Sequence, residues 1–250
     1  MHIRTKQTLL QIPIRQNLTD AHERAWRRLG QPGTWWTAEE RIRIASAARA
    51  AVNCEFCRQR KAALSSNMVS GAHTPCPGLS ESVIDLVHRL RTDADRFGPS
   101  LFASFVPGVV SAERYVELVG IVATVTAIDT FDTIMGRALR GWPVSEPGEP
   151  TRKRPNGAAL DQAFTPMVAP DAIDASDPNE AAMYAGRAGM YIHRALSLVP
   201  AEVVNFFDLD DVMYLPDRQL RDYGTEYRAI THAQIEFLAA RVSALNRCIY

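Results

Sequence analysis

Cys54 and Cys57 lie three positions apart in the segment NCEFCRQRK, and three cations follow them within about one helical turn. A thiolate is the reactive form of cysteine, and both nearby cations and a helix N-terminus stabilise it. If Asn53 ends one helix and caps the next, Cys54 lies close to such a terminus. One thiolate of the pair would then attack a peroxide to give a sulfenic acid, and the second thiol would condense with it to a disulfide.

The same two cysteines also fit a metal site. After fifteen residues that follow Cys57, the sequence offers His73 and then Cys76. Thiolates and imidazoles are the usual ligands of tetrahedral zinc, and this spacing suits a Cys3His site. The alternative predicts that zinc is the cofactor. A third interpretation is a non-catalytic helical interaction protein, with Cys54 and Cys57 buried in its core.

The composition excludes some classes of function. The chain of 250 residues has a formal net charge of zero, with 46% hydrophobic and 22% charged residues. A protein that mainly grips nucleic acid or an anionic membrane carries a basic surplus, so we expect neither partner. The longest apolar stretch, from Tyr115, is too short to span a bilayer and contains Glu117. No segment resembles an export signal, so we expect a cytoplasmic protein whose cysteines stay reduced.

Helical periodicity recurs along the chain, whereas strand patterns are scarce. The patterns predict helices over residues 37–51, 80–95, 111–139 and 231–246. Two of them open with a capping box, in which a threonine and the glutamate or glutamine three positions later satisfy free backbone N–H groups. We therefore expect an all-α protein. The isolated histidines His88 and His193 are expected to be surface or core residues and not ligands.

The sequence also repeats at an offset of 194 residues, which pairs Thr37 with Thr231 and Cys54 with Cys248. This register predicts two related helical units. The first covers residues 20–142, a proline-rich linker or surface arm covers 143–180, and a second unit begins in 181–250. The partner of Cys57 would fall one position past the last residue, so we expect the second unit to be truncated.

Glu236 precedes Cys248 by eleven intervening residues, about three turns along one helix. A carboxylate that faces a thiol pair across a helical hairpin could relay protons. The alternative is a solvent-facing glutamate, which this spacing fits equally well.

These residues resemble a motif of the alkylhydroperoxidase branch of the carboxymuconolactone-decarboxylase-like family: Glu, eleven residues, Cys-x-x-Cys, then His four positions later. The segment THAQIEFLAARVSALNRCIY resembles its lead-in, and TWWTAEERIRIASAARAAVNCEFCRQRKAALS resembles a divergent first unit. By position, Glu236 matches the acid and Cys248 the first thiol of the second unit. Cys54 and Cys57 match the dithiol of the first unit, with Cys57 as the thiol that attacks the peroxide.

The first unit departs from the motif at two positions. Ile42 stands where the family has its acid, and Lys61 stands where it has its histidine. The resemblance implies an alkylhydroperoxidase-like helical bundle that forms homo-oligomers and binds no cofactor. It implies thiol-dependent reduction of organic hydroperoxides, with a hydroperoxide as substrate and an external thiol protein or dithiol as reductant.

Overall fold

The structure is a computed structural model that describes residues 13–248, and it is mostly helical. The longer helices are α1 (Gln16–Leu29), α2 (Ala38–Ala51), α3 (Glu55–Ala62), α4 (Glu81–Thr92), α5 (Pro99–Phe105), α6 (Ala112–Ile134), α9 (Pro200–Met213) and α11 (His232–Leu245). The short elements are α7 (Pro178–Met183), α8 (Tyr191–Arg194), α10 (Asp217–Leu220), η1 (Ser66–Met68), η2 (Ala94–Arg96), η3 (Pro170–Ala172), β1 (Ala158–Ala159) and β2 (Met167–Val168). The expectation of an all-α protein is confirmed.

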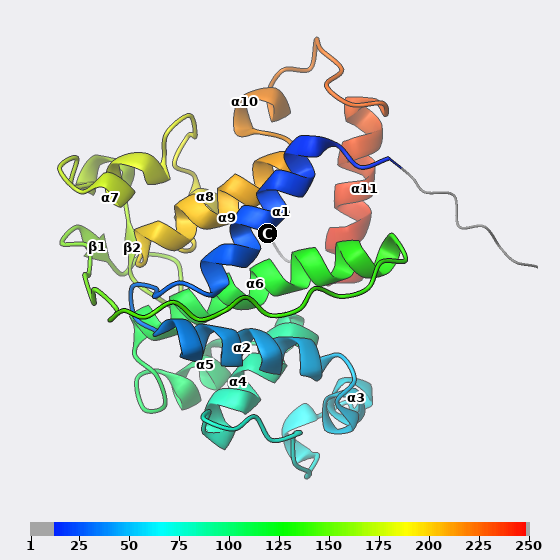
Figure 1. The fold of residues 1–250 in the computed structure, drawn as a ribbon, viewed down its shortest axis with the longest axis vertical. Helices are drawn as coiled ribbons and strands as arrows, with labels where there is room; N and C mark the ends of the chain where they lie inside the picture. Colours follow the sequence, from blue (N-terminus) through cyan, green and yellow to red (C-terminus); the bar gives the residue numbers. More distant parts are fainter. Residues whose placement is uncertain (1–12, 249–250) are drawn as a thin grey trace, which may run out of the picture.

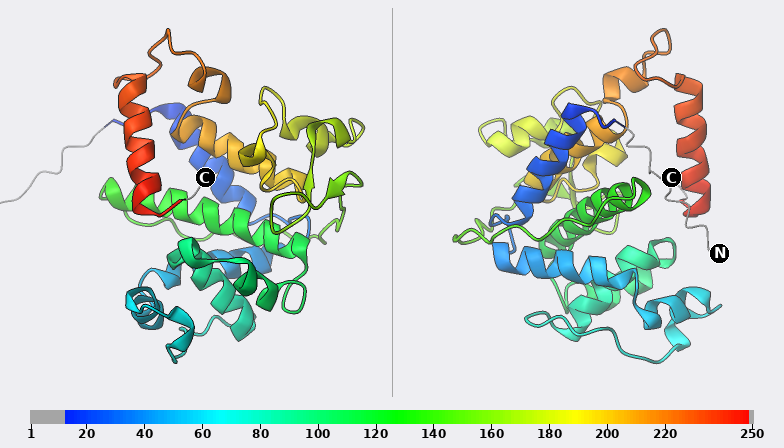
Figure 2. Two further views of the ribbon diagram at one scale, coloured as in Figure 1. Left: turned by 180° about the vertical axis from the view of Figure 1, so that it is seen from behind. Right: turned by 45° about the vertical axis from the view of Figure 1, so that its right-hand side comes forward.

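Helix α6 runs through the middle of the molecule and organises the other helices (Figure 1). It packs against α2 and α4 on one side and against α1 and α9 on the other, and α7 covers α9 further out (Figure 2). The strands β1 and β2 form a small antiparallel pair beside α7. Within residues 13–248, no helix combines the length and the apolar character needed to cross a membrane.

The four predicted helices are present as α2, α4, α6 and α11. Each begins after a residue whose side-chain oxygen accepts a hydrogen bond from the backbone N–H three positions on: Thr37, Ser80, Ser111 and Thr231. Both predicted capping boxes form. A side-chain oxygen at this position satisfies one of the four free N–H groups at the start of a helix. Serine and threonine therefore mark these helix starts in the sequence.

The core lies where α2 and α6 meet. Helix α2 presents only small apolar side chains and one isoleucine there, and all are buried: Ile44, Ala45, Ala47, Ala48 and Ala51. The facing side chains of α6 are larger and fully buried: Leu118, Ile121, Val125 and Ile128. Alanine allows two helix backbones to approach closely, while the larger side chains of α6 fill the remaining space.

A buried ion cluster joins three of these helices. Arg41 on α2 forms ion pairs with Glu117 on α6 and, at 3.0 Å, with Glu202 on α9. Glu117 also accepts a hydrogen bond of 2.6 Å from the backbone N–H of Trp35. Gly120 makes room for the cluster, because a Cβ atom there would lie 2.5 Å from a carboxylate oxygen of Glu202. One guanidinium thus serves two carboxylates inside the protein.

The proline-rich segment after α6 lies along the protein surface as an extended arm (Figure 1). Trp142 at its start stacks on Trp26 at 5.3 Å, and the guanidinium of Arg49 lies 3.9 Å from the centre of the Trp142 ring. Further along, the backbone N–H of Glu146 donates to the carbonyl of Gly30. These contacts tie the arm to α1 and α2.

Helix α11 has the same position in the repeat as α2, but its environment is different. His232 and Ile235 are its only buried residues among those that the structure describes. Four large apolar side chains on it are exposed: Phe237, Leu238, Val242 and Leu245. The matching positions of α2 near its end, Ala48 and Ala51, are buried in the core. The two helices share a cap and a length, but they do not share a packing environment.

Replacement of Glu117 by glutamine tests the ion cluster. Burial and the nearby Glu202 raise the pKa of Glu117 to about 7, although Arg41 opposes the shift. A carboxyl whose folded pKa is raised contributes stability below its unfolded pKa, and that contribution is lost as the pH rises through 7. Between pH 5 and pH 8, wild type should therefore lose about 1–3 kcal/mol more unfolding free energy than Glu117→Gln.

Urea unfolding at several pH values measures this difference. The matched control is Glu149→Gln, which makes the same chemical change at an exposed position. Parallel pH profiles for wild type and Glu117→Gln would contradict a proton held by the cluster.

Candidate metal centre

Cys54 and Cys57 are placed by the turn between α2 and α3. The backbone N–H of Cys54 donates to the carbonyl of Ala51, which closes α2, and Cys54 itself is the N-cap residue of α3. Cys57 then lies in the first turn of α3. The expected helix break is present, but Cys54 and not Asn53 caps the new helix. Both cysteines are buried, with exposed fractions of 5% and 4%.

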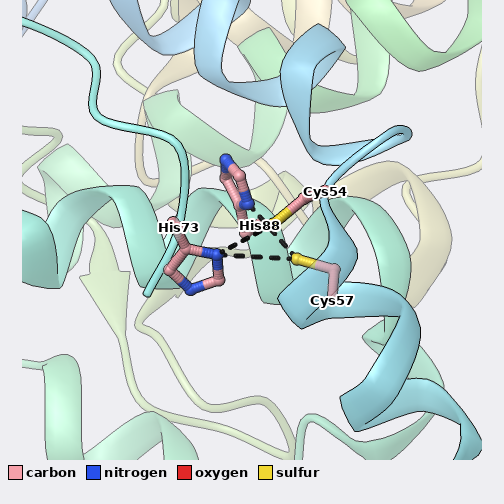
Figure 3. Close-up of side chains that lie close together, drawn as sticks. All are labelled: Cys54, Cys57, His73 and His88. Carbon is pink, nitrogen blue, oxygen red and sulfur yellow. Dashed lines mark hydrogen bonds between the residues drawn. The ribbon is translucent and has the colours of Figure 1, made fainter. Parts of the chain in front are cut away.

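Two histidines meet these cysteines from other parts of the chain (Figure 3). His73 comes from the irregular segment between η1 and α4, and His88 comes from the middle of α4. His73 Nδ1 lies 3.5 Å from Cys54 Sγ and 3.6 Å from Cys57 Sγ. His88 Nδ1 lies 3.2 Å from Cys57 Sγ. These four ligand atoms all lie within 4.8 Å of one another.

The distances between these atoms match the edges of a zinc tetrahedron. With a Zn–S bond of about 2.3 Å and a Zn–N bond of about 2.05 Å, tetrahedral geometry puts sulfur and nitrogen ligands about 3.6 Å apart. Three of the four sulfur–nitrogen distances here are 3.2, 3.5 and 3.6 Å. The side chains are therefore close to the arrangement that a tetrahedral cation at their centre would need.

Asp85 orients His73 from the outside. Its Oδ1 lies 2.8 Å from His73 Nε2, and because a carboxylate only accepts, this nitrogen carries a proton. Nδ1 is thus the atom that His73 presents to the thiols. Arg60 and Arg89 form ion pairs with the same carboxylate and hold it in place. A carboxylate behind a ligand histidine is a common feature of zinc sites, where it fixes the ring and raises its basicity.

The electrostatics favour a charged His73 beside a neutral His88, and they lower the pKa of the Cys54 thiol. Burial opposes a proton on His73, but Asp85 and the two thiols outweigh it and raise the His73 pKa to about 10. Burial and the adjacent His73 lower the His88 pKa to about 4. Burial would raise the pKa of the Cys54 thiol, but the nearby Cys57 backbone N–H and His73 lower it overall. A divalent cation could replace the proton that His73 holds here.

The cluster corrects part of the predicted zinc site. Cys54, Cys57 and His73 converge as predicted, but Cys76 does not belong to the group. Its sulfur instead faces the backbone carbonyl of Arg43 at 3.6 Å. The fourth position belongs to His88, which was expected to be a surface or core histidine and not a metal ligand. His88 is fully buried, so it is a core histidine and not a surface histidine, and it faces Cys57.

A sequence signal for His88 and Asp85 did exist. His88 lies four positions after the buried Ile84, which puts both on one helix face, and Asp85 lies three positions before His88. A histidine on an apolar helix face with a carboxylate one turn earlier indicates buried polar groups, although in this structure Asp85 supports His73 and not His88. The pattern names no partner, however, because the partners come from α3 and from the segment before α4.

The other predicted site residues lie outside the cluster. Lys61 is exposed in the last turn of α3. Glu236 is exposed on α11 and accepts a hydrogen bond of 2.7 Å from the hydroxyl of Tyr214. Cys248 is exposed just after α11. The cluster of four ligands includes none of these three residues.

A cavity of about 800 Å³ lies next to the cluster, but the thiols do not line it. Its wall includes His73, Asp85 and Cys76, and neither Cys54 nor Cys57 belongs to it. The two sulfur atoms thus lie behind His73, on the inner side of the site.

Compared with protein-family models, with curated proteins and with solved structures, the chain has no match. The fold and the site define it as a mostly helical protein with a buried Cys2His2 cluster.

Thiol labelling tests this burial. With iodoacetamide on metal-free protein, we expect Cys248 to react first, Cys76 second, and Cys54 and Cys57 much more slowly, since the reagent must reach the sulfur. Peptide mass spectrometry at successive times gives the order. Cys54 labelled as fast as Cys248 would show that the low thiol pKa, and not burial, controls this site.

Proposed function

We propose that this protein binds one zinc ion through Cys54, Cys57, His73 and His88. The observation that carries the proposal is the convergence of these four ligand atoms, from three separate segments, to within 4.8 Å of one another. Thiolate and imidazole donors in a tetrahedral arrangement favour zinc over calcium or magnesium, which prefer oxygen ligands.

The arrangement favours a structural ion. Four protein ligands complete a tetrahedron, whereas a catalytic zinc keeps one position for water or substrate. All four side chains are also nearly inaccessible, with side-chain exposure of 8% for His73 and residue exposure of 0–5% for the other three. The zinc would join the end of α2, the start of α3 and the middle of α4. It would also anchor the irregular segment around His73.

This segment needs an anchor. Between Ala63 and Ser80 the only regular structure is the single turn η1, and no residue of the segment is fully buried. A segment with so few apolar contacts opens at low cost in free energy. Because zinc would bind the folded arrangement and not the open one, it would stabilise the folded form by mass action.

A dithiol peroxidase is the second candidate, and the Asp85–His73 pair favours it. The family motif places an acid and a histidine beside the thiols, and this pair supplies both groups here. In that function a thiolate attacks the distal peroxide oxygen, and His73 protonates the departing alkoxide. The other thiol then displaces water from the sulfenic acid to form a disulfide, which an external thiol reduces. The alkylhydroperoxidase-like bundle of two related units belongs to this second proposal.

Metal analysis of wild type and two single variants tests the first proposal. We expect about one zinc per chain, with two sulfur and two nitrogen ligands by X-ray absorption. His88→Ala removes a ligand and should weaken zinc binding by at least about tenfold, whereas Cys76→Ser should leave it unchanged. Equal loss in both variants would contradict the assignment of His88 over Cys76.

The same preparation distinguishes the two candidates. One equivalent of cumene hydroperoxide is added, and the thiols are counted before and after. Zinc-loaded protein should keep all its thiols. Two results together would overturn the zinc proposal and support the peroxidase. The protein would contain no zinc as purified, and it would rapidly lose two thiols, located to Cys54 and Cys57.

Asp85→Asn tests the support behind His73. Loss of the carboxylate leaves every ligand in place but removes the group that orients the His73 ring, so zinc affinity should fall about 10–100-fold. Competition with a chromophoric chelator measures the affinity. Glu81→Gln is the matched control, an acidic-to-amide change at an exposed position of the same helix. An unchanged affinity in Asp85→Asn would show that Asp85 does not position His73.

A further inference from the structure

A second cavity, of about 660 Å³, lies at the other end of α3 and α4. The last turns of both helices, the η2 turn, Thr126 of α6 and the end of α11 surround it. It shares none of its lining residues with the cavity beside the Cys2His2 cluster.

Two cations on its wall lack an acidic partner. The side chain of Arg91 has no hydrogen bond and no ion pair within residues 13–248, and its Nε atom is buried without any acceptor. Asp129 is the carboxylate whose charge acts on Arg91, but it already binds Arg49 through both oxygens. Lys61 likewise has no ion pair among the residues that the structure describes, and it is exposed on the same wall.

The acidic groups of the cavity are already engaged. Asp93 pairs with Arg96 at 2.8 Å, and Asp95 pairs with Arg247 at 3.5 Å. Arg96 also donates to the backbone carbonyls of Ala63 and Arg60, both at 2.8 Å. The carbonyls at a helix C-terminus repel anions, and Arg96 covers two of them at the end of α3. The wall therefore keeps two uncompensated positive charges.

A partly buried guanidinium without a counter-charge is unfavourable, because it loses water and gains no partner. An anion in the cavity would supply that partner. The rest of the wall is partly apolar, with Leu64, Leu90 and Leu245. This combination suits a charged head with a short hydrocarbon body.

We propose that this cavity binds a small amphipathic organic anion, whose carboxylate or phosphate head contacts Arg91 and Lys61 and whose apolar part lies against Leu90 and Leu245. The site shares no residue with the Cys2His2 cluster. Arg91 supplies a planar donor group that matches either head, and Lys61 adds a point charge at the rim.

Binding of octanoate, inorganic phosphate and octanol to the full chain tests this site. Isothermal titration on the protein as purified measures the three affinities. Octanoate should bind more tightly than phosphate, which lacks the hydrocarbon body, and than octanol, which lacks the charge. Failure of octanoate to bind, or phosphate binding more tightly than octanoate, would overturn the proposal.

Two variants locate the binding. Arg91→Met and Lys61→Met keep an unbranched apolar side chain and remove the charge, so each should raise the octanoate dissociation constant about tenfold. The matched control is Arg58→Met, an exposed arginine one turn earlier on α3 that pairs with Glu55 and does not line the cavity. Equal octanoate affinity in wild type and both cavity variants would place the ligand elsewhere and overturn the proposal.

Stability without ligand provides an independent check. Because Arg91 lacks a partner, Arg91→Met should unfold at the same temperature as wild type or higher, and added octanoate should raise that temperature less than in wild type. A clearly lower unfolding temperature for ligand-free Arg91→Met would show that Arg91 already has a stabilising partner, which contradicts the premise.

Discussion

The ion cluster of Arg41, Glu117 and Glu202 is the constraint on which the arrangement of the helices depends. It is the point where α2, α6 and α9 meet away from water, and loss of Arg41 would leave two buried carboxylates without a cation. Hydrophobic packing alone allows helices to slide by a fraction of a turn. A guanidinium shared by two carboxylates permits far fewer positions, so the direction and end point of α2 are fixed. The turn that carries Cys54 begins where α2 ends.

The Cys2His2 cluster combines local and distant contacts. The turn between α2 and α3 brings Cys54 and Cys57 together by itself, because one caps α3 and the other lies in its first turn. His88 reaches them only because α4 packs against both α2 and α3. His73 arrives from a segment with little structure and depends on the Asp85 carboxylate for its orientation. The turn between α2 and α3, helix α4 and the irregular segment around His73 therefore each supply ligands to one small volume. A single cation there would bind to all three parts of the chain.

The positions of four helices could be predicted from the sequence because the signals that start a helix lie within a few neighbouring residues. Each of the four predicted helices has an N-cap residue and its hydrogen-bond donor within four positions of sequence. These N-cap residues are Ser80, Ser111 and the two threonines of the capping boxes. Only part of the candidate site could be predicted from the sequence. Nearness in sequence identified the cysteine pair and favoured Cys76 as a fourth ligand, but three-dimensional packing placed His88 there instead. The role of Asp85 depends on a contact twelve residues away, which no spacing rule reports. The repeat predicted the length and cap of α11 and said nothing about its exposed surface.

The irregular segment between the cysteines and His88 also has a consequence for the unfolded chain. Cys57 and His88 are 31 positions apart, so an ion that holds both closes a loop of that size. Closing such a loop costs the open chain conformational entropy worth about 3–4 kcal/mol, which the bonds to the ion must offset. A disulfide across a span of this length would impose a similar restriction until a reductant cleaved it. A metal crosslink is instead reversible, so the tether that holds α3 to α4 would follow the supply of the ion.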